Sequence, residues 1–289
     1  DENQLAAGEA FFDLGEYAVS PDGTLLAYTT DLVGYRQYVL HVKELRTGKV
    51  RAHLAERVTS LAWSRDGASL FFVQEDPVTK RSDTLSRLDF ETGATEVLYV
   101  EKDELYGLGV ELSRSEAFVF AVSQSKTTSE VRYLSATNPK AAFKVFLPRR
   151  DGHEYYVDHL GPDFFVRTND FGKTFRLVAA PVSDPLPAAW REVLPVRAGV
   201  MLEDVECFAT HFVTVERANG VPKLTVHDLN GAAPEPVEFS EPSYTVHPVR
   251  NEEFDTDTFR FSYESLTTSP SVFDYNVKTR ARVLRKQQP

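Results

Sequence analysis

The chain has 289 residues, 42% of them hydrophobic, and its 43 acidic residues outnumber its 32 basic ones to leave a net charge of −11. This composition is sufficient for a folded core and excludes an intrinsically disordered chain. The acidic balance argues against nucleic acid as a partner, because its phosphates would be repelled. The single Cys207 excludes a disulfide framework and a multi-cysteine metal site.

No apolar run reaches the length of a membrane-spanning helix, so we expect no contact with a membrane. The first residues, Asp1-Glu2-Asn3-Gln4, do not resemble a signal peptide. The sequence therefore predicts a soluble protein of the cytoplasm.

A strand–turn–strand element recurs along the chain. The turns are marked by Gly48, Gly93, Pro139, Asp184, Gly231 and Arg280, at steps of 45, 46, 45, 47 and 49 residues. Glycine favours such turns because it allows a positive φ, and Asp or Asn favours them by bonding back to its own backbone. A period of this length is typical of repeat architectures.

A second turn marker lies between successive copies of the first. It is clearest as Ser20-Pro21-Asp22-Gly23 and Ser64-Arg65-Asp66-Gly67, each followed by a strand-like run. Related segments occur at residues 113–116, 161–163, 209–215 and 255–261. Each repeat therefore holds about four short strands, and four strands in roughly 40 to 50 residues are typical of a β-propeller blade.

We therefore predict an all-β fold, with a single β-propeller domain over residues 1–289 and blades of four antiparallel strands. Six repeats are visible, with predicted units 12–53, 54–100, 101–148, 149–196, 197–241 and 242–289. No segment has the helical periodicity that a parallel α/β fold would need, and the best helical candidate, 187–194, is short. WD repeats are disfavoured because Trp63 and Trp190 are not followed by Asp.

The sequence shows no catalytic apparatus of its own. It lacks a Gly-x-Ser-x-Gly nucleophile motif and the glycine-rich loops that bind phosphates or dinucleotides, so we predict no cofactor. Cys207 lies in a strand-like run and is interpreted as a small buried hydrophobic residue. His153 and His159 read as one strand, where six positions at about 3.3 Å each separate them by roughly 20 Å. We therefore predict no metal there.

Several charged residues have two open interpretations. Glu101 and Asp103 belong to an acidic stretch, and a second one runs from Glu235 to Glu241; both either solubilise the surface or attract basic substrates. Arg149 and Arg150 lie in a charged turn that is either a solvated loop or a docking site for another domain or a peptide carboxylate. Paired carboxylates of a sugar-cleaving propeller also stay open, because distances between blades cannot be read from a sequence.

The ordered set of segments resembles the propeller domain of oligopeptidase B, in the prolyl oligopeptidase family of serine peptidases, along almost the whole chain. The matching motifs include Phe11-Phe12-Asp13-Leu14-Gly15, Asp76-Pro77-Val78-Thr79, Phe146-Leu147-Pro148-Arg149-Arg150 and Arg167-Thr168-Asn169. One departure is Ala10, where relatives often carry an acidic residue before the aromatic pair. Contacts assigned to that acid do not transfer to this chain.

The resemblance implies a larger enzyme, in which a seven-bladed propeller caps an α/β-hydrolase domain whose Ser-Asp-His triad cleaves short peptides after Arg or Lys. The triad would lie beyond Pro289, and strands before Asp1 would complete the seventh blade. This chain would then be a non-catalytic gate that selects substrates by size. Its partners would be the catalytic domain of the same polypeptide and short basic peptides, contacted by Glu101, Asp103, Arg149, Arg150 and His153. The alternative is a stand-alone propeller that serves as a binding scaffold.

Overall fold

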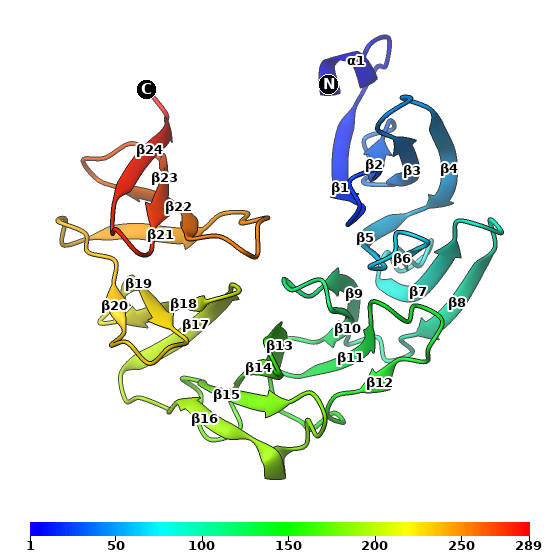
Figure 1. The fold of residues 1–289 in the computed structure, drawn as a ribbon. Helices are drawn as coiled ribbons and strands as arrows, with labels where there is room; N and C mark the ends of the chain where they lie inside the picture. The colour runs from blue at the N-terminus through cyan, green and yellow to red at the C-terminus, as the bar shows by residue number, and fades with distance from the viewer. The chain divides into compact units, whose positions relative to one another are not determined.

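The chain folds into six β-sheets, each with four antiparallel strands. The computed structural model describes all residues from Asp1 to Pro289. Within each sheet the strands are neighbours in chain order, so every sheet is a simple meander (Figure 1). The six four-stranded repeats confirm the fold class expected from the spacing of the turns. None of the helices is long and apolar enough to cross a membrane.

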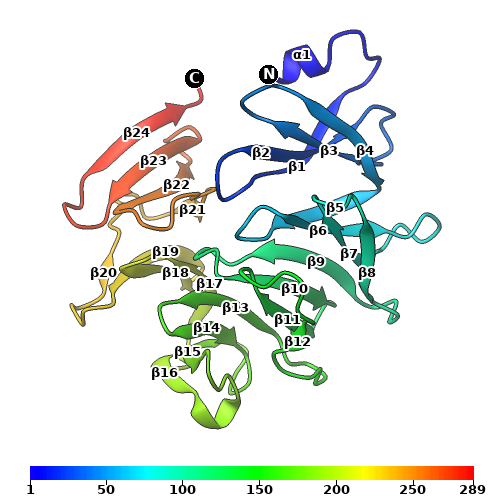
Figure 2. The same ribbon diagram turned by 45° about the vertical axis from the view of Figure 1, so that its right-hand side comes forward.

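The chain packs as two compact units, Asp1–Gly152 and His153–Pro289. Figure 2 colours the strands of the first unit from blue to green and those of the second from green to red. In the first unit, the short helix α1 (Glu2–Leu5) precedes the strands β1 (Asp13–Val19), β2 (Leu25–Asp31), β3 (Val39–Glu44), β4 (Val50–Glu56), β5 (Val58–Trp63), β6 (Ser69–Glu75), β7 (Ser82–Asp89), β8 (Thr95–Val100), β9 (Gly107–Leu112), β10 (Phe118–Gln124), β11 (Ser129–Ser135) and β12 (Lys144–Val145).

The second unit also contains three sheets. Its elements are β13 (Tyr155–Leu160), β14 (Asp163–Thr168), β15 (Arg176–Pro181), the 3-10 helix η1 (Pro187–Ala189), β16 (Arg191–Leu194), β17 (Val200–Cys207), β18 (His211–Ala218), β19 (Val221–Asp228), β20 (Glu235–Pro236), β21 (Tyr244–Pro248), β22 (Thr258–Ser265), β23 (Ser271–Asn276) and β24 (Arg282–Gln287). The helical candidate at 187–194 is thus a single 3-10 turn followed by a strand.

The second strand of a sheet is buried on both faces, because successive residues of a strand point to opposite sides. In β6, Leu70 and Phe72 pack into the core shared with the first sheet, whereas Phe71 and Val73 pack into the core shared with the third. The same alternation occurs in the second unit, where Phe212 and the neighbouring Val213 enter different cores. Continuous apolar runs such as 70–73 follow from this two-sided burial.

The predicted Ser-x-Asp-Gly turns have the same hydrogen bonds in both copies. The Ser20 hydroxyl donates to Asp22 Oδ1 at 2.6 Å, and the Ser64 hydroxyl donates to Asp66 Oδ1 at 2.6 Å. Gly23 and Gly67 take the required positive φ of 71° and 67°. The Trp63 indole then donates to the Ala18 carbonyl at 3.0 Å and ties the second sheet to the first.

Each sheet of the first unit has two distinct ends. The "turn end" carries the connection from the first to the second strand, and the "loop end" carries the connection from the second to the third. The chain enters at the loop end, because Asp13 at the start of β1 pairs with Asp31 at the end of β2. In the sixth sheet, β24 likewise ends beside a loop of this kind, since Gln287 pairs with Ser271.

Candidate functional site at the loop end of the first unit

Two of the predicted site residues, Glu101 and Arg149, form a buried ion pair at the loop end. Glu101 follows β8, and only 2% of the residue is exposed. Arg149 Nη1 donates to Glu101 Oε1 at 3.2 Å, and Nη2 forms a second hydrogen bond to Oε2. The guanidinium also lies over the Tyr106 ring, 3.9 Å from its centre. This two-pronged geometry is the strongest arrangement of an arginine and a carboxylate.

The surroundings of Glu101 keep its carboxylate ionised. Burial acts to raise the pKa of Glu101, but hydrogen bonds from neighbouring groups, above all from Arg149, outweigh it and hold the pKa at about 2. The Tyr99 hydroxyl donates to Glu101 Oε2 at 2.9 Å, and the Asp103 amide donates to Oε1 at 3.0 Å. Glu101 is therefore an anchor for the segment that follows it.

A second ion pair continues the network into the third sheet. Arg132 Nη2 lies 2.6 Å from Glu130 Oε1, and its guanidinium covers the Tyr99 ring at 3.8 Å. The Arg149 amide donates to the other Glu130 oxygen at 3.3 Å. Sequence reasoning missed Glu130 and Arg132 as members of the site, because they lie on a strand some 20 residues from either predicted cluster.

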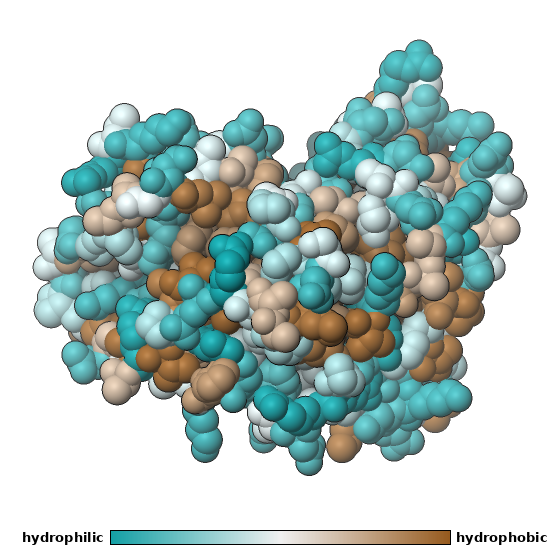
Figure 3. Space-filling view, turned by 60° about the horizontal axis from the view of Figure 1, so that its bottom comes forward, coloured by the Kyte–Doolittle hydropathy of each residue, from teal (hydrophilic) through white to brown (hydrophobic).

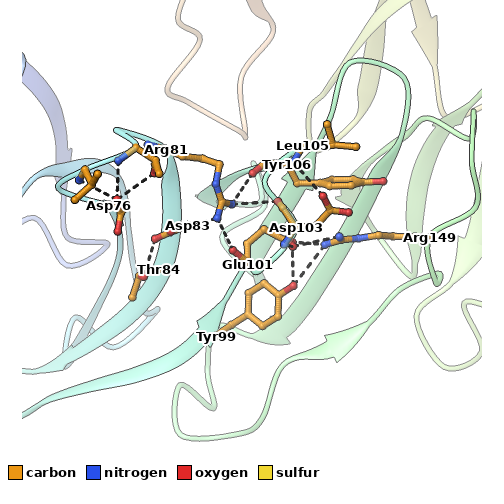
Figure 4. Close-up of polar contacts among 12 residues, drawn as sticks. Asp76, Arg81, Asp83, Thr84, Tyr99, Glu101, Asp103, Leu105, Tyr106 and Arg149 are labelled. Atoms are coloured by element: carbon orange, nitrogen blue, oxygen red, sulfur yellow. Dashed lines mark hydrogen bonds and ion pairs between the residues drawn. The ribbon is translucent and has the colours of Figure 1, made fainter.

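Two further arginines tie neighbouring loops together at the same end. Arg81 donates to the carbonyl oxygens of Glu101 and Tyr106, both at 2.9 Å, and of Asp103 at 3.2 Å (Figure 4). Arg57 donates to Glu75 Oε1 at 3.1 Å and to Gln37 Oε1 at 3.2 Å. Arg57 thus links the β4–β5 connection to the β2–β3 connection, and Arg81 links the β6–β7 connection to the β8–β9 connection.

The loops held in this way present apolar side chains to solvent. In three of them, an aspartate accepts a hydrogen bond from the amide two residues later: Asp31 from Val33, Asp76 from Val78, and Asp103 from Leu105. These three apolar residues are 58%, 85% and 78% exposed. Exposed apolar groups on a rigid loop are typical of a surface that contacts another molecule.

Further apolar residues are exposed in the loop that carries Val33 and in two loops of the second unit. Tyr35 in the first unit and Phe171 and Leu266 in the second are 77%, 75% and 98% exposed, and each lies in a connection from the second to the third strand of its sheet. On the face drawn in Figure 3, hydrophobic residues are scattered among hydrophilic ones.

The other predicted site residues have different environments. Asp103 and Arg150 are exposed. His153 begins the second unit, is 6% exposed, and its Nε2 lies 2.9 Å from Thr168 Oγ1. His153 precedes β13, whereas His159 lies within it and packs edge-on against Phe164. Cys207 is fully buried, as expected from the sequence.

In the second acidic stretch, Glu235 to Glu241, one carboxylate is hydrogen-bonded to a neighbouring strand and loop. Glu241 accepts hydrogen bonds from the Tyr263 and Thr267 hydroxyls, and these bonds lower its pKa to about 2. The bonds hold the loop between β22 and β23, which carries Leu266 at its tip. No group of three or more His, Cys, Asp or Glu side chains is arranged to hold a metal ion.

Comparisons with known proteins cover the whole chain. The model of the N-terminal β-propeller domain of prolyl oligopeptidase matches residues 1–288. The chain is 36% identical over its full length to dipeptidyl aminopeptidase BI from Pseudoxanthomonas mexicana, and 28% identical over 96% of its length to protease 2 from Moraxella lacunata. It spans 40% of the length of each of these proteins.

The fold is likewise that of a solved peptidase domain. The structure superimposes on oligopeptidase B from Leishmania major with a TM-score of 0.90 at 25% identity, over 100% of this chain and 42% of that one. The fold is therefore the β-propeller that the sequence predicted. With its full-length match to the family model, the chain belongs to the family of N-terminal β-propeller domains of prolyl oligopeptidases.

Proposed function

We propose that this chain is the non-catalytic propeller of a serine peptidase that resembles oligopeptidase B, and that its two units form one domain. In this proposal the propeller covers an α/β-hydrolase domain of the same polypeptide and admits only short peptides. Bond cleavage belongs to that catalytic domain, and we propose that it occurs after Arg or Lys. The similarity to oligopeptidase B and to proteins named as peptidases supports the assignment.

The observation that carries the proposal is the construction of the loop end. Its loops are tied by Arg57, Arg81 and Arg149, and they expose apolar tips at the same end of the sheets as the start of β1. A rigid surface loses little conformational entropy when it is covered, so it is suited to repeated docking and release. A covering domain joined to the chain at this end would reach it directly.

The five predicted contact residues divide into two roles within this proposal. Glu101 and Arg149 are positioning residues, because their charged groups satisfy each other and hold the segment 101–106. Asp103 and Arg150 are exposed, so we propose that they contact the catalytic domain or the peptide. His153 is buried against Thr168, so we propose that it supports the segment that follows Arg150.

The charge of the domain supports a cationic substrate. A net charge of −11 gives the protein a negative field that attracts basic peptides and raises their rate of encounter. Because such a field is screened by salt, the rate of cleavage of basic peptides should fall as the ionic strength rises.

The test introduces charge at the apolar tips in the complete polypeptide. The double variant Val78→Asp with Leu105→Asp should weaken docking, lower kcat/KM for a short peptide after Arg at least tenfold, and permit cleavage of longer chains. Val97→Asp, at a 58% exposed position of the outer strand β8, is the matched control and should leave both properties unchanged.

Three results would argue against the proposal. Unchanged kcat/KM and unchanged size selection in the double variant would exclude docking at the loop end. Absence of peptidase activity in the complete polypeptide would favour the scaffold alternative. If only peptides with a free amino terminus were cleaved, the enzyme would act as an aminopeptidase, and the proposed likeness in specificity to oligopeptidase B would be wrong.

A further inference from the structure

A separate pocket lies at the turn end of the first unit, between the first and second sheets. Its volume is about 300 Å³, and it is lined by Leu25, Val42, Glu44, Lys49, Arg51 and Phe90. This volume is at the small end of the range for sites of small organic ligands. Leu25 begins β2 and Phe90 directly follows β7, so the pocket lies at the opposite end of the sheets from the loops described above.

Strand register explains why these residues meet. In the first sheet, Leu25 pairs with Glu44, and Val42 pairs with Arg51. The Glu44 amide donates to the Lys49 carbonyl at 2.8 Å, so these two residues are also opposite each other. Paired residues, and residues two positions apart, point to the same side of a sheet. The five side chains therefore share the face that looks towards Phe90.

The pocket combines an apolar base with two cations. Val42 is 2% exposed, and Leu25 and Phe90 are half-buried. The Arg51 guanidinium lies 5.4 Å from the centre of the Phe90 ring, and Nη1 donates to the Phe90 carbonyl at 3.4 Å. Neither Lys49 nor Arg51 has a carboxylate within ion-pair distance.

The one acid at the pocket is already engaged. Glu44 accepts a hydrogen bond from the Thr47 hydroxyl at 2.7 Å and lies 3.7 Å from Arg46 Nη2. The whole β3–β4 hairpin, Val39 to Glu56, carries four Lys or Arg and only two Glu, so it is locally basic in a protein of net charge −11. A basic hairpin around an apolar base is suited to a ligand that is both anionic and apolar.

We propose that this pocket binds a carboxylate with an apolar body. The carboxylate would accept hydrogen bonds from Arg51 and Lys49, and the apolar body would cover Leu25, Val42 and the Phe90 ring. Two sources offer this chemistry: a free aliphatic or aromatic acid, and the carboxyl end of a peptide with an apolar last residue. The site is independent of the proposed peptidase function, because it lies at the other end of the sheets.

The test titrates 3-phenylpropionate and hexanoate into the protein and measures Kd by calorimetry, with the corresponding amides as uncharged probes. We expect each carboxylate to bind at least tenfold more tightly than its amide. In the double variant Lys49→Gln with Arg51→Gln, the Kd of the carboxylates should rise at least tenfold. Both residues are exposed, so the variant should keep the thermal midpoint of the unchanged protein.

Lys43→Gln is the matched control. Lys43 lies on the same hairpin next to Val42, and its side chain points to the opposite face of the sheet. The substitution removes one positive charge without altering the pocket, so the Kd of the carboxylates should change less than twofold.

A peptide that ends in Phe, with a free or an amidated carboxyl end, identifies the source of the ligand. If the peptide with the free carboxyl end binds more tightly than the small acids, the site is assigned to peptides.

Two results would overturn the proposal. Equal affinity for carboxylates and amides would show that Lys49 and Arg51 do not recognise the charge. An equal loss of affinity in the Lys43 variant and in the double variant would show that the carboxylates are attracted to the basic surface in general and do not bind at a specific site.

Discussion

The Arg149 guanidinium donates two hydrogen bonds to the Glu101 carboxylate, although the two residues are 48 positions apart in the chain. The pair joins the segment after β8 to the segment after β12. It therefore connects the second and third sheets of the first unit through charge and not only through the apolar core. The exposed tip at Leu105 depends on this anchor, because the Asp103 amide also donates to Glu101.

Glu101→Gln should destabilise the protein substantially. The change leaves the Arg149 cation without its main partner, and loss of one member of a buried pair costs about 3 to 5 kcal/mol. We expect the lower part of this range, because the Arg149 side chain is 24% exposed and water can still solvate its charge. Denaturant unfolding measures the effect, and the exposed Glu104→Gln should change stability by less than about 0.5 kcal/mol. Equal effects of the two changes would contradict this role.

Acidification below neutral pH should destabilise the second unit through His227. Burial lowers the pKa of His227 from 6.5 to about 4, and its ring stacks on Phe212 while Nε2 lies 3.1 Å from Thr214 Oγ1. Between pH 6.5 and 4, His227 is protonated in the unfolded chain but stays neutral in the folded one. The free energy of unfolding therefore falls as the pH falls. From these pKa values the loss is about 2 kcal/mol at pH 5.

Unfolding free energies at pH 7 and pH 5 measure this effect. His227→Gln keeps a hydrogen-bond donor for Thr214 but has no group that titrates in this range. The difference in stability between the two pH values should therefore be smaller in the variant by about 2 kcal/mol. Equal differences in both proteins would show that another group carries the pH dependence.

Gly15→Ala should destabilise the first sheet by about 1 to 3 kcal/mol, the usual cost of overpacking. An added Cβ would lie 2.5 Å from Thr29 Oγ1 and 2.7 Å from the Tyr38 ring. The ring cannot easily move, because the Tyr38 hydroxyl donates to Asp13 Oδ2 at 2.6 Å. Gly107→Ala, on β9 with nothing within 4 Å of the added atom, is the control and should not lower the thermal midpoint.

Asp31→Ala should release the loop between β2 and β3. The buried carboxylate accepts hydrogen bonds from the amides of Val33 at 2.9 Å, Gly34 at 3.1 Å and Arg36 at 2.6 Å. Hydrogen exchange at these three amides should become at least tenfold faster. The matched change Asp22→Ala acts at the turn end and should leave them protected. Unchanged exchange in the Asp31 variant would show that another contact orders the loop.

The repeat architecture could be predicted from the sequence because turn chemistry is local. The Ser-x-Asp-Gly segments need only their own side chains and a glycine with positive φ to end one strand and start the next. The even spacing of the turn markers from Gly48 to Arg280 indicated the six sheets and the all-β class. The short helix α1 escaped notice because four residues, Glu2 to Leu5, show no periodicity.

The candidate site could be predicted only in part. Glu101 and Arg149 stood out as charged residues, but nothing in the sequence distinguished them from Asp103 and Arg150, which stay exposed. Whether a charged side chain points into a junction or into solvent depends on strand register and on the neighbouring sheet. Arg57 and Arg81 escaped notice for the same reason, since their acceptors lie in other loops.

The sequence by itself thus determined the number of sheets, their strands and their turns, because each of these follows from side chains close together in the chain. Only the tertiary structure decided which charges are paired, which apolar residues are left exposed, and where a pocket forms between Arg51 and Phe90. These features arise where sheets meet face to face, between residues tens of positions apart. Their geometry depends on packing, which no local pattern encodes.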